Sequence, residues 1–253
     1  MSVLPDQYVR KARLYVTVLL VLPAALAVVC VAGETVLETS TSLGKVAAGS
    51  TLVGLVVGSL LMLAEQVARA GRKQQPYLFH KWGGPPLSEA IHGRGDLEHR
   101  ESWQRIRQFL ADQVGGEAGN DPKSRDLESE LKELTRDKAK FGMVFHENCN
   151  FGFRRNLYGV KPWGFGSAAT AIVVGGLFLF SQLGQPQSAV LPWLTLIVGL
   201  VALLLWSCVT PMFVRHAASA YVDAMQGAGL TLIRDHRKSD SPQASSDDKV
   251  GAT

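Results

Sequence analysis

Residues 162–214 contain no charged side chain, and this stretch constrains the fold more than any other feature of the chain. Two further stretches, 14–33 and 46–64, are also free of charge. A helix needs about 20 apolar residues to cross the hydrocarbon core of a bilayer, so each shorter stretch suffices for one crossing. The mean hydropathy of +0.10 is modest because it averages apolar and polar parts. We therefore predict an integral membrane protein rather than a soluble or disordered chain.

The 162–214 stretch is too long for a single crossing. The segment Gly184–Ser188 divides it, because Gly-x-Pro with polar neighbours is typical of a turn. We therefore expect four transmembrane helices in two hairpins, at Leu14–Gly33, Val46–Ala64, about Gly164–Leu183 and about Val190–Val214.

The first of these segments resembles a signal peptide at its basic start, where Arg10, Lys11 and Arg13 stand. Its apolar run is longer than the roughly 7–15 residues of a signal core. The residues before Cys30 also lack the small residue that a lipoprotein signal places there. We expect a retained membrane anchor.

Lysine and arginine are distributed asymmetrically about the expected spans. Of the 26 basic residues, only Lys45 falls in a loop on the far side. Since cytoplasmic loops carry the excess of positive charge, both termini and the long middle segment are expected in the cytoplasm of a bacterial cell, and the protein in its inner membrane.

These boundaries predict an all-α integral membrane protein with a helical cytoplasmic insert between the second and third spans. The expected parts are a cytoplasmic N-terminus (1–13), transmembrane hairpin 1 (14–69), a cytoplasmic helical domain (70–161), transmembrane hairpin 2 (162–214), a helical extension (215–237) and a disordered tail (238–253).

The cytoplasmic insert carries 16 basic and 13 acidic residues with both signs interspersed. This pattern indicates a solvated helical surface rather than a phosphate-binding stripe, which disfavours nucleic acid as a partner. Apolar spacing predicts helices over 96–114 and from Asp121 to about His146. Their combined core is small for a free domain, so we expect them to pack on the span ends or on another subunit. A soluble protein or a small signal ligand would bind here.

The turn Trp82-Gly83-Gly84-Pro85-Pro86 is expected to follow a second span that projects beyond the lipid. Ser88 is expected to cap a short helix after it.

Small residues recur at every fourth position in two spans, and such stripes let helices approach closely in lipid. We interpret the stripes first as packing within one subunit, and self-association into a homo-oligomer is the alternative. The residues are Ser50, Gly54 and Gly58 in the second span and Ser167, Ala171 and Gly175 in the third.

The segment 148–164 alternates aromatic residues with Arg154, Arg155 and Lys161. Such a mixture suits the headgroup layer, so we expect a membrane-entry elbow in contact with anionic lipid headgroups. The alternative is a site where Arg154, Arg155 and Asn156 hold an anionic ligand or lipid head, with Lys161 and Trp82 nearby.

No catalytic set, metal site or cofactor site is predicted. His146 and Cys149 stand three apart on a helix, but no second ligand pair matches them. The three cysteines form no disulfide pattern. No charged residue lies at mid-membrane, which argues against an ion-coupled transporter or an intramembrane hydrolase.

Two motifs, WGGPP at 82–86 and NFGFRRN at 150–156, resemble those of a bacterial family of four-span membrane proteins with no assigned activity. The family pattern reads Trp-Gly-Gly-x-Pro and Asn-x-Gly-Phe-Arg-Arg-Asn. Hydroxyl residues follow its first motif, whereas Pro86 and Leu87 stand here. More loosely, the span plan is similar to the four-span effectors of bacterial nucleotide-signal defence systems, which implies a breach of the inner membrane on a trigger.

The sequence leaves four function classes open. The first is a non-enzymatic, oligomeric effector or pore-former controlled by its cytoplasmic domain. The second is a membrane scaffold or regulatory subunit that docks a soluble partner through the cytoplasmic helical hairpin. An enzyme that uses cytoplasmic residues at the lipid face is less favoured, because no catalytic set is evident. A transporter is less favoured because no charged residue lies within the spans.

Overall fold

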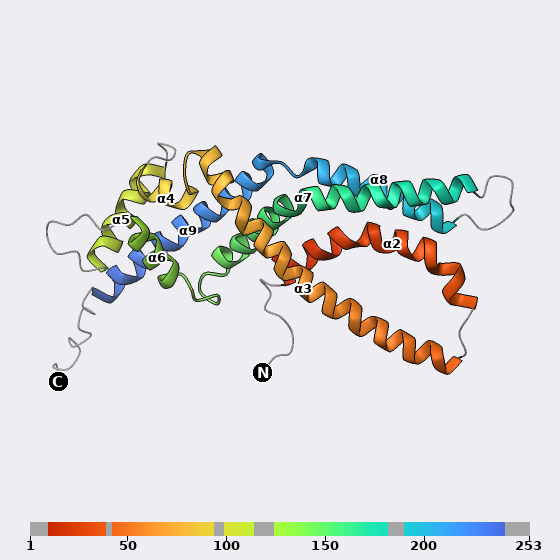
Figure 1. Ribbon diagram of the computed structural model, residues 1–253. Coiled ribbons are helices and arrows are strands. Elements are labelled where there is room, and N and C mark those ends of the chain that lie inside the picture. The colour runs from red at the N-terminus through yellow and green to blue at the C-terminus, as the bar shows by residue number, and fades with distance from the viewer. Residues whose placement is uncertain (1–9, 39–41, 94–98, 114–123, 182–189, 241–253) are drawn as a thin grey trace, which may run out of the picture. The chain divides into compact units, whose positions relative to one another are not determined.

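The structure is a computed structural model (Figure 1). It describes the backbone of residues 10–38, 42–93, 99–113, 124–181 and 190–240, and the side chains of 11–31, 58–93, 99–113, 126–181 and 190–239. Every regular element within these ranges is a helix, which confirms the all-α prediction. The elements are η1 (Arg10–Leu14), α2 (Tyr15–Glu38), α3 (Ser42–Trp82), α4 (Pro86–Ile91), α5 (Arg100–Gln113), α6 (Ser124–Leu134), α7 (Gly142–Ser181), α8 (Val190–Cys208) and α9 (Pro211–Asp240).

Three helical segments in the described part of the chain are long and apolar enough to cross a membrane. They are Lys11–Val31, the helix α7 and the helix α8. The remaining expected span, 46–64, falls within α3, where the side chains before Gly58 lie outside the described residues. The membrane class is therefore supported by three helices, and the fourth span stays a prediction.

The helix expected from Asp121 to about His146 is wrong in its extent. The helix α6 ends at Leu134, where Thr135 turns its hydroxyl back to donate to the carbonyl of Leu131 (2.7 Å). Asp137 then accepts the backbone N–H of Ala139 through its side chain (2.9 Å). Short polar side chains that bond to nearby backbone compete with the helical ladder, and two such bonds lie where α6 ends.

The elbow expected over 148–164 is also wrong, because α7 is one continuous helix from Gly142 to Ser181. At about 1.5 Å per residue it is roughly 60 Å long, well beyond a hydrocarbon core of about 30 Å. Pro162 lies inside it and removes one backbone donor without ending the helix.

The fourth span was expected to run to Val214, but α8 ends at Cys208 and α9 begins at Pro211. Thr210 between them accepts the backbone N–H of Phe213 on its hydroxyl (3.2 Å). A threonine followed by proline at the first helical position is a strong helix start, and this explains the break. Of the expected tail, 238–240 form the last turn of α9 and the remainder lies outside the described residues.

The turn expected after the second span is present, with Gly83 and Gly84 at φ of +91° and +149°. The expected cap is wrong: α4 begins at Pro86, two residues before Ser88, with Pro85 in the N-cap position and no side-chain cap. Proline fixes φ near the helical value, so it starts the helix without a polar cap. Of the helix expected over 96–114, α5 confirms Arg100–Gln113, and residues 96–98 and 114 lie outside the described residues.

The chain divides into two compact units. The first, which we call the membrane unit, comprises Met1–Lys81 and Asn148–Ala218. The second, the polar unit, comprises Trp82–Glu147 and Ser219–Thr253. The boundaries expected at 69/70 and 161/162 fall inside α3 and α7, and both α7 and α9 contribute residues to each unit.

Each unit has its own apolar core. In the membrane unit the buried members include Val16, Val67, Leu157, Ala168 and Trp206. In the polar unit α4, α5 and α6 pack with the ends of α7 and α9. Its buried core consists of Leu87, Ala90, Ile91, Trp103, Ile106, Leu110, Leu127, Leu131, Phe141, Val144, Met225 and Ala228.

Candidate functional site

Four of the five residues predicted to hold a ligand or lipid head lie on α7 in the membrane unit. Trp82, the fifth, ends α3 and belongs to the polar unit. It is half-buried.

Arg154 and Lys161 bind carbonyl groups at the junction between α8 and α9. The Nζ atom of Lys161 donates to the carbonyl of Val209 (2.8 Å). The Nη1 atom of Arg154 donates to the carbonyl of Phe213 (3.0 Å) and its guanidinium lies 4.5 Å from the centre of that ring. Val209 directly follows the last residue of α8, so Lys161 satisfies a carbonyl at the negative end of that helix dipole. The carbonyl that Arg154 binds belongs to the first turn of α9.

Arg155 and Asn156 join α7 to other helices of the membrane unit. Arg155 donates from Nη1 to Oε1 of Gln75 on α3 (2.8 Å). Asn156 is 1% exposed and donates from Nδ2 to the carbonyl of Ala12 (2.7 Å). These polar groups therefore hold the helices in register, whatever else they bind.

The small residues of the third span lie at helix contacts within the chain. Ser167 accepts the backbone N–H of Ala24 on α2 (3.2 Å), and Ala171 is fully buried. A Cβ added to Gly175 would lie 2.8 Å from the backbone nitrogen of Leu196 on α8. In the second span, the side chain of Ser50 and the surroundings of Gly54 lie outside the described residues, and Gly58 faces open space.

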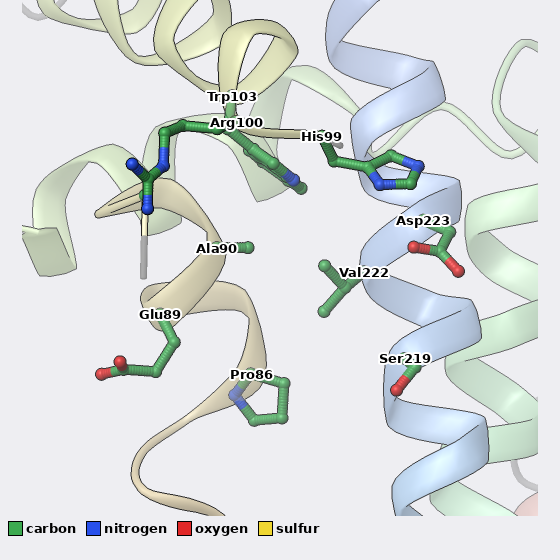
Figure 2. A pocket seen from close by; sticks show the side chains of 10 residues that line it. Pro86, Glu89, Ala90, His99, Arg100, Trp103, Ser219, Val222 and Asp223 are labelled. Carbon is green, nitrogen blue, oxygen red and sulfur yellow. The ribbon is translucent and has the colours of Figure 1, made fainter. Parts of the chain in front are cut away.

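The polar unit contains the candidate ligand pocket, a hollow of about 330 Å³ between α4, α5 and α9. Figure 2 shows Val222 and Ala90 facing each other across it, with His99 and Asp223 on one side and Glu89 and Arg100 on the other. Trp103 is 4% exposed and forms part of its wall.

The Gly83-Gly84 turn positions Glu89. A Cβ added to Gly84 would lie 2.6 Å from Oε1 of Glu89, so this carboxylate covers the glycine directly. The backbone N–H of Glu89 also donates to the carbonyl of Pro85 (2.9 Å). The WGGPP motif thus shapes the edge of the pocket, because only glycine combines this φ with so close an approach.

The pocket combines an apolar wall with charges of both signs, which is typical of sites for small polar ligands. Trp103 offers a flat apolar surface, while Arg100 and Asp223 offer a cation and an anion. The sequence did not single out these residues. Ser219 and Asp223 stand four apart on α9, but nothing in the sequence relates them to Arg100.

Within the described residues, no group of three histidine, cysteine or acidic side chains is placed to hold a metal ion. Cys30 and Cys149 are buried and Cys208 is exposed, and none of these three cysteines forms a disulfide.

Comparison of the chain with protein-family models, with curated proteins and with solved structures finds no match.

Proposed function

We propose that this chain is a non-enzymatic, multi-pass protein of the bacterial inner membrane, an oligomeric effector or pore-former that its polar unit controls. One observation carries the proposal: α9 provides Ser219, Val222 and Asp223 to the candidate ligand pocket and begins, at Pro211, within the membrane unit. A ligand that moves these side chains acts on a helix that the membrane unit shares. Such a shared rigid element is a physical route for coupling two sites.

The oligomer is proposed because the described membrane helices hold no continuous polar path. Their buried polar side chains are Thr17, Asn156 and Thr195, and each donates to a backbone carbonyl of the same chain. Polar groups in lipid need such partners. A water-filled path would therefore form between copies, gated by apolar side chains.

Dye release from proteoliposomes tests this function. The purified chain should release a trapped dye with a steep dependence on protein density, as expected for an oligomeric pore. Ser219→Trp, which fills the pocket, should change the release rate about fivefold or more if the pocket is coupled to the membrane unit. Ser239→Trp, on an exposed turn of the same helix, is the matched control. A chain that never releases dye at any density would overturn the proposal.

A scaffold or regulatory subunit is the second candidate. The polar unit has an apolar groove of about 550 Å³ between the start of α7 and α9, lined by Phe141, Met143 and Ala224. Met143 is 70% exposed, and exposed methionine suits adaptable binding surfaces. If the chain is a scaffold, a soluble protein should copurify with the unsubstituted chain and should be lost from the Met143→Asp variant. Neither of the two chains should release dye from vesicles.

A further inference from the structure

An apolar groove of about 430 Å³ opens between α2, α7 and α8 in the membrane unit. Leu19 and Leu22 line it from α2, and Val201 and Leu205 line it from α8. Each of these four side chains is at least 40% exposed. The lining on α8 extends from Ile197 to Cys208, a rise of about 16 Å. The groove is therefore long and narrow, and runs along the helix.

Two cations of α7 bind backbone carbonyls of residues that line this groove. Arg154, Leu157 and Lys161 fall on one face of α7, because they are three and four residues apart. Leu157 lines the groove. The carbonyl groups that Arg154 and Lys161 bind belong to Phe213 and Val209, which line it too. Both cations therefore donate hydrogen bonds to groove-lining residues that follow the end of the apolar helix α8.

Neither cation has its charge neutralised within the described part of the chain. The ion pairs found there do not include Arg154 or Lys161. Their partners are the two carbonyls and the ring faces of Phe213 and Phe165. A guanidinium has five N–H donors and an ammonium three, so donors remain for an anion.

We propose that this groove binds an anionic phospholipid, with its phosphate between Arg154 and Lys161 and one acyl chain along α8. An apolar channel whose lining residues bind two uncompensated cations matches a molecule with a charged head and a long apolar chain. Free phosphate would leave the exposed leucines uncovered, and a zwitterionic lipid would bring its own cation to the pair. The proposal rests on the membrane location in the proposed function and not on the formation of a pore.

Native mass spectrometry of the full chain in detergent, after delipidation, tests the site. Titration with dioleoyl phosphatidylglycerol should give one bound lipid at lower concentration than titration with dioleoyl phosphatidylcholine. Arg154→Gln and Lys161→Gln should each weaken phosphatidylglycerol binding about fivefold, as expected for one charge near an anionic head. Lys73→Gln, an exposed cation on α3, changes the net charge equally and should have no effect.

A groove variant and a competitor separate the alternatives. Val201→Phe, which fills the groove, should weaken binding of both lipids. Millimolar inorganic phosphate should not displace phosphatidylglycerol; full displacement identifies a free-anion site and overturns the proposal. Equal affinity of the unsubstituted chain for the two lipids also overturns the proposal. This comparison does not depend on whether any variant folds. If the chain prefers phosphatidylglycerol but releases no dye, the lipid site is supported and the proposed pore function is contradicted.

Discussion

The Nη1 atom of Arg13 donates to Oε2 of Glu65 over 2.8 Å, joining residues that lie 52 positions apart in the chain. Glu65 also accepts a hydrogen bond from Arg72 (3.2 Å) and lies 3.8 Å from Arg69. One carboxylate thus serves three arginines where the end of the second expected span meets the start of the first helix.

We predict that Glu65→Gln lowers the stability of the membrane unit. The change leaves three arginines close together without a counter-charge. The side chain of Glu65 is 41% exposed, so solvent screening limits the loss to about 1 kcal/mol. Thermal unfolding in detergent, followed by tryptophan fluorescence, measures it. Asp112→Asn removes an exposed carboxylate of the polar unit and should leave the transition unchanged. A loss that does not shrink in high salt would contradict the electrostatic explanation.

Gly159 and Gly71 bring α7 and α3 into backbone contact. A Cβ on Gly159 would lie 2.5 Å from the backbone nitrogen of Gly71 and 2.6 Å from the carbonyl carbon of Ala70. Backbone atoms cannot give way as a side chain does, so Gly159→Ala should cost about 1–3 kcal/mol.

The matched control for this change is Gly166→Ala on the same helix, where the added methyl group meets nothing within 4 Å. Since alanine is the better helix former, this control should be neutral or stabilising. The two variants are compared by thermal unfolding in detergent. Equal transition temperatures would show that the contact of α3 with α7 is not tight.

The pattern of apolar residues predicted most of the helices, because burial in lipid or in a core imposes a period that the sequence displays. It did not predict where they end. Thr135 and Thr210 end or start helices through hydrogen bonds of single hydroxyl groups. Each such local bond contributes about 1 kcal/mol of free energy, and the spacing of apolar residues does not reveal a contribution of this size.

The candidate sites were less predictable than the helices. Arg154 and Lys161 were singled out from the sequence as cations among aromatic residues, but the carbonyls they bind lie 59 and 48 positions away, respectively. The candidate ligand pocket was missed because its walls come from α4, α5 and α9, and no local motif relates Arg100 to Asp223.

The pair formed by Lys140 and Asp235 predicts an acid-dependent change in the polar unit. The hydrogen bond from the Lys140 side chain lowers the pKa of Asp235 below its usual value. Desolvation opposes this shift, and the charges of Lys140, Lys238 and Arg234 assist it. Because the pKa is lower in the folded chain, this stabilisation is present above the unfolded pKa of about 3.9 and is lost as the pH falls through the folded pKa.

Lys140→Met should raise the pKa of Asp235 towards its ordinary value and remove that part of the acid dependence. Carboxyl-carbon NMR of the labelled chain in detergent follows the titration, and Asp235→Asn assigns the signal. An unchanged Asp235 titration in Lys140→Met would mean that the 2.8 Å ion pair does not persist in solution.

Thr210→Ala should loosen the start of α9 and with it the carbonyls that Arg154 and Lys161 bind. Thr210 accepts the N–H of Phe213 on its hydroxyl, and Pro211 stands at the first helical position. Loss of such a cap costs about 1 kcal/mol, which corresponds to roughly fivefold faster hydrogen exchange of the Phe213 amide. Thr210→Ser keeps the acceptor and should restore slow exchange. Thr170→Ala is the control, because that hydroxyl donates to the carbonyl of Gly166 and caps no helix start. If serine fails to restore protection, the hydroxyl is not what separates α8 from α9, and the imino ring of Pro211 alone makes the break.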